Sequence, residues 1–422
     1  MIKSAGAAIL VLLIIAAVFA QQRGGSRFAR AIPWAETGVW LKAETHVHTS
    51  FSDGRSLDEL VDQAVANGCD VLAITDHTDS DLKAATPEYH AAIAAARTRA
   101  PGLLILSGIE WNVPPGGGDD HAVVLFPPEM DDAAITGEFK AAFDDFKRPD
   151  HRAELAVAAF DWLRTRGARA SEAPVVFLNH PGRKAKDIDA VRTQIEWLSK
   201  IGRGTFAGVE GAPGHQNAQP LGAYKEALTP EDRWDPAIAP PGAAWDQLLA
   251  RGSTVSGALA TSDFHSTKGD YWPCQFSASW IYAPDRSPAG VLKALRAGSF
   301  AGVHGGIATH VQLALAAEGL PRQAIAGEEV RLAPGTKATI ELRVRVPATD
   351  WSSEPNRLDH VDLIGITKEG TSILQSGPLD AKGTFTHSFA IPSGGIVIRA
   401  RGRRIIENGP DLLFHTNAIA VR

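Results

Sequence analysis

Between residues 41 and 299, short apolar segments alternate with amphipathic segments, and this alternation narrows the fold more than any other feature of the chain. Seven apolar segments are expected as β-strands: residues 43–47, 71–75, 103–108, 122–126, 175–178, 205–209 and 254–260. Helices are expected at residues 56–67, 87–100, 153–166 and 243–251. Strands that alternate with helices favour parallel βα units, and seven of them favour a barrel over an open sheet.

Two long segments interrupt the alternation. Residues 127–150 follow the fourth predicted strand as an insertion, and residues 211–242 are rich in Pro, Gly and Ala. Connections of this length in a compact domain usually carry function or move. We expect the second segment to cross the active-site end of the barrel.

The pattern changes after residue 305. Strands are expected at residues 310–316, 338–346, 361–367, 384–391, 395–400 and 417–421, with Gly, Pro and Asn turns between them. Apolar Ile340, Leu342 and Val344 alternate with charged residues, as in a half-buried strand. Residues 306–422 are therefore predicted to form a small all-β, sandwich-like domain. A basic run there is typical of a solvated strand face; it consists of Arg399, Arg401, Arg403 and Arg404.

The N-terminus has the pattern of a targeting segment. Lys3 precedes an apolar run over residues 5–19, and Ala20 ends a small-residue cleavage motif. We expect a signal peptide over residues 1–20, a linker over 21–40, and a mature protein that is periplasmic or secreted. The alternative is a retained membrane anchor, for which the run is short. The membrane is expected as a partner only if this segment is retained as an anchor.

The two cysteines, Cys69 and Cys274, leave two interpretations open. Cys69 enters an apolar strand, where cysteine is usually a small buried side chain. In an oxidising compartment the pair could instead form a disulfide.

Composition limits the partners. The chain has 422 residues, 44% of them hydrophobic, and a net charge of −6 with neutral histidines. These values describe a soluble globular protein with enough apolar material for a core and no overall basic field, so we expect no nucleic acid partner. A small phosphorylated substrate would need locally placed Lys or Arg. Nothing in the sequence indicates an oligomeric state.

Ionisable residues stand at the ends of almost every strand predicted for the barrel. His46 and His48 are two residues apart, as are Asp263 and His265, so each pair shares one face of an extended segment. The full set is His46, His48, Asp53, His77, Glu110, His121, His180, Asp263 and His265. Barrel active sites are built at the carboxyl ends of strands.

Each of these residues taken alone is more often structural than a metal ligand. Together they would form a desolvated, unpaired cluster, and bound divalent cations would remove that cost. The sequence therefore predicts a metal centre.

The motifs that carry these residues resemble those of the PHP (polymerase and histidinol phosphatase) superfamily. They are His46-Val-His48-Thr-Ser-Phe-Ser-Asp53-Gly, Thr75-Asp76-His77, Glu110, Asn179-His180-Pro181 and Ser262-Asp263-Phe264-His265. The resemblance covers about residues 41–305. The trailing β-domain and the segment 243–249 (Ala-Ala-Trp-Asp-Gln-Leu-Leu) resemble the carbaryl-hydrolase-like branch.

The resemblance implies a distorted (βα)7 barrel that holds two or three divalent ions (zinc, manganese or iron). It implies a first ion held by His46, His48, Glu110 and Asp263. Glu110 would bridge to a second ion held by His121 and His180, and Asp53, His77 and His265 would hold the third. Glu110 and Asp263 are expected to act in catalysis, through a metal-bridging hydroxide and no covalent enzyme intermediate. Asp76 either orients ligands or caps a helix.

Substrate-binding residues and the scissile bond are less constrained. Arg183, Lys184 and Lys268 are expected near the mouth of the barrel, where they either grip a phosphate or are solvated loop charges; His215 and His304 are further candidates. A phosphoesterase is the leading hypothesis, because a multi-metal clamp suits phosphoryl displacement. The alternatives are hydrolysis of an amide, carbamate or aryl ester, and a non-catalytic exported metal-binding protein.

Overall fold

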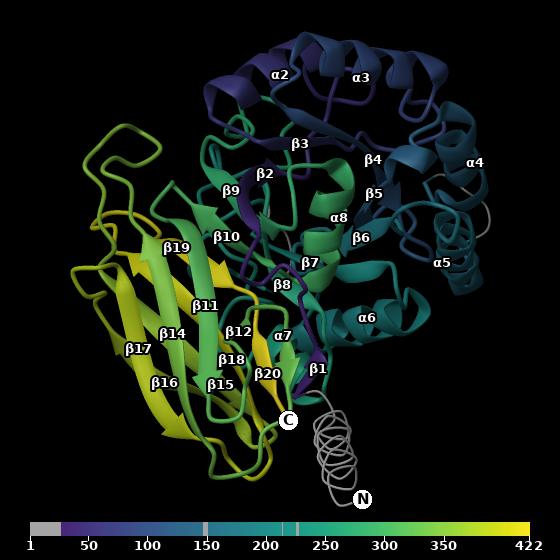
Figure 1. The fold of residues 1–422 in the computed structure, drawn as a ribbon. Coiled ribbons are helices and arrows are strands. Elements are labelled where there is room, and N and C mark those ends of the chain that lie inside the picture. Colours follow the sequence, from purple (N-terminus) through teal and green to yellow (C-terminus); the bar gives the residue numbers. More distant parts are fainter. Residues whose placement is uncertain (1–26, 147–150, 213, 225–227) are drawn as a thin grey trace, which may run out of the picture.

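The computed structural model describes residues 27–422, except for residues 147–150, 213 and 225–227. A curled sheet covered by helices forms one part, and an all-β region packs beside it (Figure 1). The predicted signal peptide and its cleavage site after Ala20 lie outside the described residues. Within the described ranges, no helix has the length and apolar character needed to cross a membrane.

The seven predicted strands all form and pair in sequence order. They are β2 (Val39–Glu44), β3 (Val71–Ile74), β4 (Leu104–Asn112), β5 (His121–Leu125), β6 (Val175–Leu178), β7 (Phe206–Ala212) and β8 (Ser256–Ala260). The two ends of the curled sheet meet beyond β2 and β8, where Val47 forms a parallel bridge with Phe264. His48 N donates to Phe264 O there at 2.9 Å. The predicted distorted barrel is confirmed.

One strand breaks the parallel arrangement that the pattern favours. β5 runs antiparallel to both β4 and β6, so the prediction of uniform parallel βα units is wrong at this strand. The connection over residues 113–120 contains no helix, and a hairpin of this kind joins only antiparallel strands. The start of β5, at His121, therefore lies at the same edge as the carboxyl ends of β4 and β6.

Helices cover the outside of the curled sheet (Figure 1). They are α2 (Leu57–Ala66), α3 (Pro87–Arg99), α4 (Ala133–Phe143), α5 (Ala153–Gly167), α6 (Ile188–Ile201), α7 (Ala244–Ala250) and α8 (Pro288–Ala297). α2, α3, α5 and α7 match the predicted helices to within one residue at each end. α4 lies in the segment 127–150 that was expected as an insertion, and Asp132 caps it by accepting from the N–H groups of Ala134 and Ile135.

The all-β region is a sandwich of two sheets, as predicted. One sheet contains β12 (Ala324–Ile325), β11 (Thr309–Ala317), β14 (Lys337–Arg345) and β17 (Thr384–Ala390). The other contains β16 (Gly370–Gly377), β15 (His360–Thr367), β18 (Ile396–Arg404), β19 (Leu412–Thr416), β20 (Ile419–Val421), β13 (Glu329–Val330) and β1 (Phe28–Arg30). Ile340 and Leu342 of the first sheet share a buried apolar cluster with Leu363 and Ile398 of the second.

The second sheet of the sandwich continues into the barrel. β19 pairs with β10 (Phe300–His304), β10 with β9 (Ser277–Ala283), and β9 with β2. Residue 305 therefore separates two regions along the chain, but hydrogen-bonded strands run unbroken from one region to the other.

The arginines of β18 are paired, which corrects the expectation of a solvated basic face. β18 lies between β15 and β19 in the sheet, and each of its four arginines meets an acidic side chain. Arg399 and Asp246 of α7 are both 0% exposed, with Nε 2.7 Å from Oδ1. The other pairs are Arg401–Asp362, Arg403–Asp411 and Arg404–Asp350.

The two cysteines form a disulfide between positions 205 residues apart. Cys69 lies in the turn between α2 and β3, and Cys274 lies between β8 and β9. The bond anchors the segment that follows β8, which carries Asp263 and His265.

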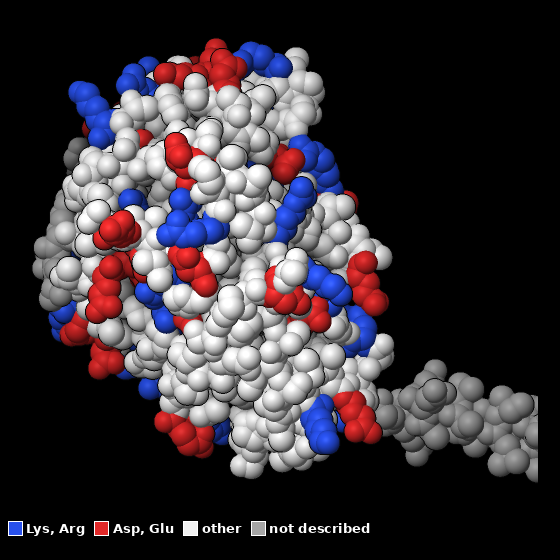
Figure 2. All heavy atoms as spheres, turned by 90° about the vertical axis from the view of Figure 1, so that its left-hand side faces the viewer, with Lys and Arg blue, Asp and Glu red and all other residues white. Residues whose placement is uncertain are grey.

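Surface charge is mixed on the sandwich side of the molecule. Figure 2 shows this face with Lys and Arg side chains interspersed with Asp and Glu side chains and a broad uncharged area. This face offers no extended basic surface of the kind that holds a nucleic acid backbone.

Candidate metal centre

The structure brings all nine predicted ligand residues together at one edge of the barrel. His46 and His48 follow β2, His77 follows β3, Glu110 lies near the end of β4, His121 opens β5, His180 follows β6, and Asp263 and His265 follow β8. Asp53 reaches the same place from the turn before α2. His121 joins the cluster from the start of its strand because β5 runs in the opposite direction.

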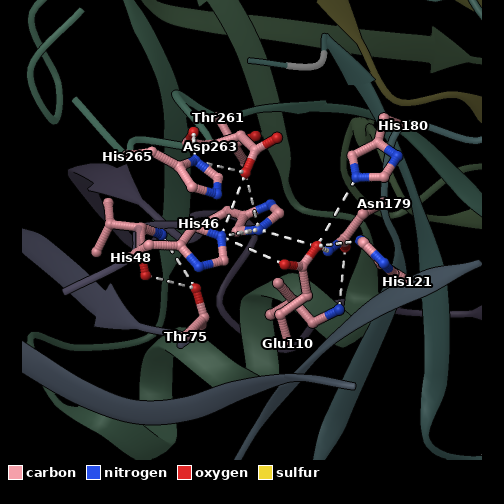
Figure 3. Close-up of polar contacts among 12 residues, drawn as sticks. His46, His48, Thr75, Glu110, His121, Asn179, His180, Thr261, Asp263 and His265 are labelled. Carbon is pink, nitrogen blue, oxygen red and sulfur yellow. Dashed lines mark hydrogen bonds and ion pairs between the residues drawn. The ribbon is translucent and has the colours of Figure 1, made fainter. Parts of the chain in front are cut away.

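Glu110 is at the centre of the cluster, and Figure 3 shows its carboxylate beside His46, His121 and His180. Oε1 is 3.2 Å from His46 Nε2, 3.2 Å from His121 Nδ1 and 3.7 Å from His180 Nε2. Oε2 is 3.3 Å from His48 Nε2 and 2.8 Å from His77 Nδ1. The side chain is 1% exposed. A carboxylate in this position can be shared by more than one cation.

Asp263 completes the group around His46 and His48. Its Oδ1 lies 3.3 Å from Nε2 of each histidine, and these two nitrogens lie 3.2 Å apart. Asp263 has a φ of 45°, a left-handed conformation that a non-glycine residue adopts only when its surroundings enforce it. The four side chains of the predicted first ion therefore face one small space.

Asp53 and His265 form the outer part of the cluster. Asp53 Oδ2 lies 3.5 Å from His265 Nε2 and 3.9 Å from His77 Nε2. The Asp53 side chain is 53% exposed, so this part faces solvent while the Glu110 part is closed. His77 stands between the two parts, because its Nδ1 contacts Glu110 and its Nε2 is directed to Asp53.

The donor atoms fit divalent cations. Glu110 Oε2 is buried, and although His77 Nδ1 and His48 Nε2 lie 2.8 and 3.3 Å from it, no described residue forms a well-aligned hydrogen bond with it. Burial lowers the pKa of His48, but Asp263 and Glu110 outweigh it and raise that pKa to about 10. The same carboxylates raise the pKa of His46 against its burial. His46 Nε2 and His48 Nε2 lie 3.2 Å apart on the same side of the cluster, so one cation there could bind both nitrogens.

Glu210, which is not among the residues predicted from the sequence, orients His46. Its Oε1 lies 2.7 Å from His46 Nδ1, on the side of the ring away from Glu110. Thr261 Oγ1 donates to the same oxygen at 3.2 Å, and His180 N donates to Oε2 at 3.0 Å. Carboxylates in this role fix the ring and raise its basicity as a ligand. Glu210 lies on β7, the barrel strand that supplies no predicted ligand, and that gap in the pattern was the signal for it.

Asp76 orients the loop after β2 and does not cap a helix. It is fully buried and accepts from Thr49 N and Thr49 Oγ1 at 2.7 Å each, and from Ser52 Oγ at 2.5 Å. The cap of the next helix, α3, is Thr86. Asp76 therefore holds the turn from which Asp53 projects.

The candidate substrate residues fall into different environments. Arg183 is buried, with Nη2 3.2 Å from Asp263 Oδ2, and Lys184 pairs with Asp119 at 2.8 Å. Lys268 is exposed. His304 ends β10 and packs against aromatic rings at the sandwich side, with no hydrogen bond to its nitrogens among the described residues.

The segment 211–242 reaches the cluster, as expected. His215 Nε2 lies 3.3 Å from Asp263 Oδ2, and its Nδ1 lies 2.7 Å from Asp270 Oδ1. Asp235 accepts from Gly182 N at 2.8 Å and so ties the segment to the turn after His180. Asp270, like Glu210, was not selected from the sequence.

Comparison with known proteins agrees with these motifs. Residues 44–210 match the PHP domain. A two-domain protein from Bacteroides vulgatus, described as containing a predicted PHP-like metal-dependent phosphoesterase, shares 16% identity and covers 93% of this chain and 98% of its own, with a TM-score of 0.44. A candidate metal-dependent phosphoesterase from Bifidobacterium adolescentis shares 18% identity over 53% of this chain and 88% of its own, with a TM-score of 0.29. No curated protein matches the sequence. The match to the PHP domain therefore covers residues 44–210, which include seven of the nine clustered residues, and Asp263 and His265 lie in the segment that follows it.

Proposed function

We propose that this protein is an exported metal-dependent phosphoesterase. The observation that carries the proposal is the buried Glu110 carboxylate within reach of five imidazoles, at the edge of the barrel where PHP motifs converge. Divalent cations, when bound, supply a Lewis acid for phosphoryl oxygens and water acidic enough to react near neutral pH.

The residues of the chain hold and shape the site. His46, His48, Glu110 and Asp263 are one ligand group, and Asn179 Nδ2 donates to Glu110 Oε1 at 2.6 Å and so fixes the central carboxylate. His121 and His180 flank Glu110 on its second side, and Asp53, His77 and His265 form the outer group. The donors are imidazoles and carboxylates, a set that suits zinc, manganese or iron. We propose direct attack of water with no covalent enzyme intermediate.

Arg183 is proposed as a positioning residue. Its guanidinium is buried against Asp263, so it balances the charge of a ligand carboxylate before any substrate arrives. A phosphate grip at the mouth falls to Lys184, which is 35% exposed. Arg183→Lys should change metal affinity, whereas Lys184→Ala should raise KM for phosphoesters without changing metal content.

A substrate panel tests the reaction class. p-Nitrophenyl phosphate, bis-p-nitrophenyl phosphate and a naphthyl carbamate are compared for the metal-loaded wild type and for Glu110→Gln. We expect hydrolysis of at least one phosphoester and loss of at least about a hundredfold in Glu110→Gln, since one strong electrostatic contact of a reacting site is worth this much. Hydrolysis of the carbamate alone would identify an amide or carbamate hydrolase. No turnover of any substrate would favour a metal-binding protein.

Export is proposed from the N-terminal segment and is supported by the Cys69–Cys274 disulfide. Such bonds persist in oxidising compartments and are rare in the cytosol. Mass spectrometry of the protein from the periplasmic or culture fraction tests it. A new N-terminus at Gln21 is expected; the intact segment in the membrane fraction would show an anchor instead.

A further inference from the structure

A cavity of about 620 Å³ adjoins the metal-ligand cluster on the side of His180. It is lined by the turn after β6, the loop before β5, and α6, and the lining includes Asn179 and His180 of the cluster. Asn179 is the residue that hydrogen-bonds Glu110. An ester whose phosphate lies at the cluster can therefore extend its organic group into this space. Cavities of a few hundred cubic ångströms accept groups the size of one or two rings.

Part of the cavity wall is apolar. Leu178, Pro181 and Val191 are buried and line the cavity, and Trp197 of α6 adds a half-buried indole. Indole faces stack with flat rings, and such contacts are favourable beyond the area that they bury. A saturated polyol would make few favourable contacts with these apolar and aromatic side chains.

The charges of the cavity cancel. Lys184 and Lys186 line it together with Asp119 and Asp120, and Lys184 Nζ lies 2.8 Å from Asp119 Oδ1. Two cations and two carboxylates leave no net charge that would attract a second phosphate in addition to the scissile one. The occupant that suits this wall is an uncharged group.

We infer that the cavity is the binding site for an uncharged aromatic or heteroaromatic group esterified to the scissile phosphate. The inference rests on the proposed phosphoesterase activity and specifies its substrate class. Trp197 is the residue that selects the ring, and Leu178, Pro181 and Val191 exclude water from it.

Two matched pairs of compounds test the inference. Benzyl phosphate and ethyl phosphate have alcohol leaving groups of similar acidity and differ in the ring, so their kcat/KM ratio reports the cavity. In benzylphosphonate and ethylphosphonate, a carbon–phosphorus bond replaces the phosphate ester, so neither compound is hydrolysed. Calorimetry with these two compounds measures binding without turnover. The wild type should prefer the benzyl compound in both pairs by about tenfold, the order of one ring-stacking contact.

Variants test whether the preference for the benzyl compounds arises in this cavity. Trp197→Ala should reduce both benzyl-to-ethyl ratios by about tenfold, and Trp197→Phe should retain part of them. Ala190→Phe, which fills the same cavity from α6, should abolish them even if Trp197→Ala fails to fold. Trp162→Ala is the matched control, because Trp162 is also half-buried, lies on α5 and does not line the cavity.

The outcomes separate this inference from the proposed function. If benzylphosphonate binds more tightly through Trp197 but neither phosphate ester is hydrolysed, the cavity assignment stands and the phosphoesterase proposal fails. If both esters are hydrolysed with equal kcat/KM and both phosphonates bind equally, the cavity assignment is overturned while the reaction class stands. Equal phosphonate binding without hydrolysis overturns both.

Discussion

Glu210 Oε1 lies 2.7 Å from Nδ1 of His46, the ring nitrogen opposite the one that faces Glu110 and Asp263. The contact fixes the ring so that Nε2 is presented to the shared space of the cluster. Both side chains are buried, so solvent does not compete for the contact. A ligand held in this way loses less freedom when a cation binds.

Removing the Glu210 carboxylate should weaken metal binding without removing a ligand. Glu210→Ala is expected to lower the affinity for Zn²⁺ or Mn²⁺ by about 10- to 100-fold. Glu210→Gln should lose less, because its amide oxygen still accepts a hydrogen bond. Competition with a metallochromic chelator measures the affinities. Glu196→Ala, on the exposed face of α6, is the control, and equal affinities for Glu196→Ala and Glu210→Ala would disprove the role.

Much of the fold and the cluster follows from local sequence patterns. The seven strands, four helices and the sandwich were predictable because apolar periodicity and end signals are local. The nine clustered residues were predictable because strand-end position and motif order depend on short segments. The antiparallel course of β5 was not predicted, since a short connection is compatible with several local structures and the direction of a strand depends on its neighbours.

Residues that act through partners distant in sequence escaped prediction. Glu210 contacts His46 across 164 positions, and Asp246 meets Arg399 across 153. Neither contact can be recognised from the residues on one side of it, because the two partners lie in separate segments of the chain. The run from Arg399 to Arg404 has the sequence pattern of a solvated face, because its partner carboxylates lie far away in sequence, on α7, β15 and connecting loops. The Cys69–Cys274 pairing likewise depends on the closure of the barrel.

The Arg399–Asp246 pair should contribute strongly to the attachment of the sandwich to the barrel. Arg399→Met leaves a buried carboxylate without its partner and should lower the free energy of unfolding by about 3 to 5 kcal/mol. Arg399→Met with Asp246→Leu should recover most of the loss, because no charge remains buried. Urea unfolding measures both variants. Arg403→Met, at a partly exposed pair, should cost less than about 1 kcal/mol; a similar loss in Arg399→Met would contradict the role of burial.

The disulfide should stabilise the protein through the length of the loop that it closes. For a separation of 205 residues, removal of both cysteines should cost about 2 to 5 kcal/mol, mainly because the unfolded chain gains freedom. Cys69→Ala with Cys274→Ala is compared with the wild type in urea, with and without a reductant. The reductant should destabilise the wild type and leave the double variant unchanged. Insensitivity of the wild type would show that the bond contributes nothing.

Asp235 should make stability depend on pH in the mildly acidic range. Burial raises its pKa from 3.8 to about 6, although Gly182, Ala237 and Tyr224 donate hydrogen bonds to it. A raised folded-state pKa gives stability that is complete below pH 4 and is lost as pH rises through 6. Relative to Asp235→Asn, the wild type should lose up to about 3 kcal/mol over this range. Parallel stability curves for the two proteins would refute the shift.

The Glu110 cluster should hold divalent cations, and the metal content of the protein tests this most directly. Full-length protein is purified without chelators and measured by inductively coupled plasma mass spectrometry, beside Glu110→Gln and the surface variant Glu196→Gln. Two or three equivalents of zinc, manganese or iron per chain are expected for the wild type and for Glu196→Gln. Glu110→Gln should carry at least one equivalent fewer. Less than one equivalent in the wild type, with activity unaffected by a chelator, would contradict the metal centre.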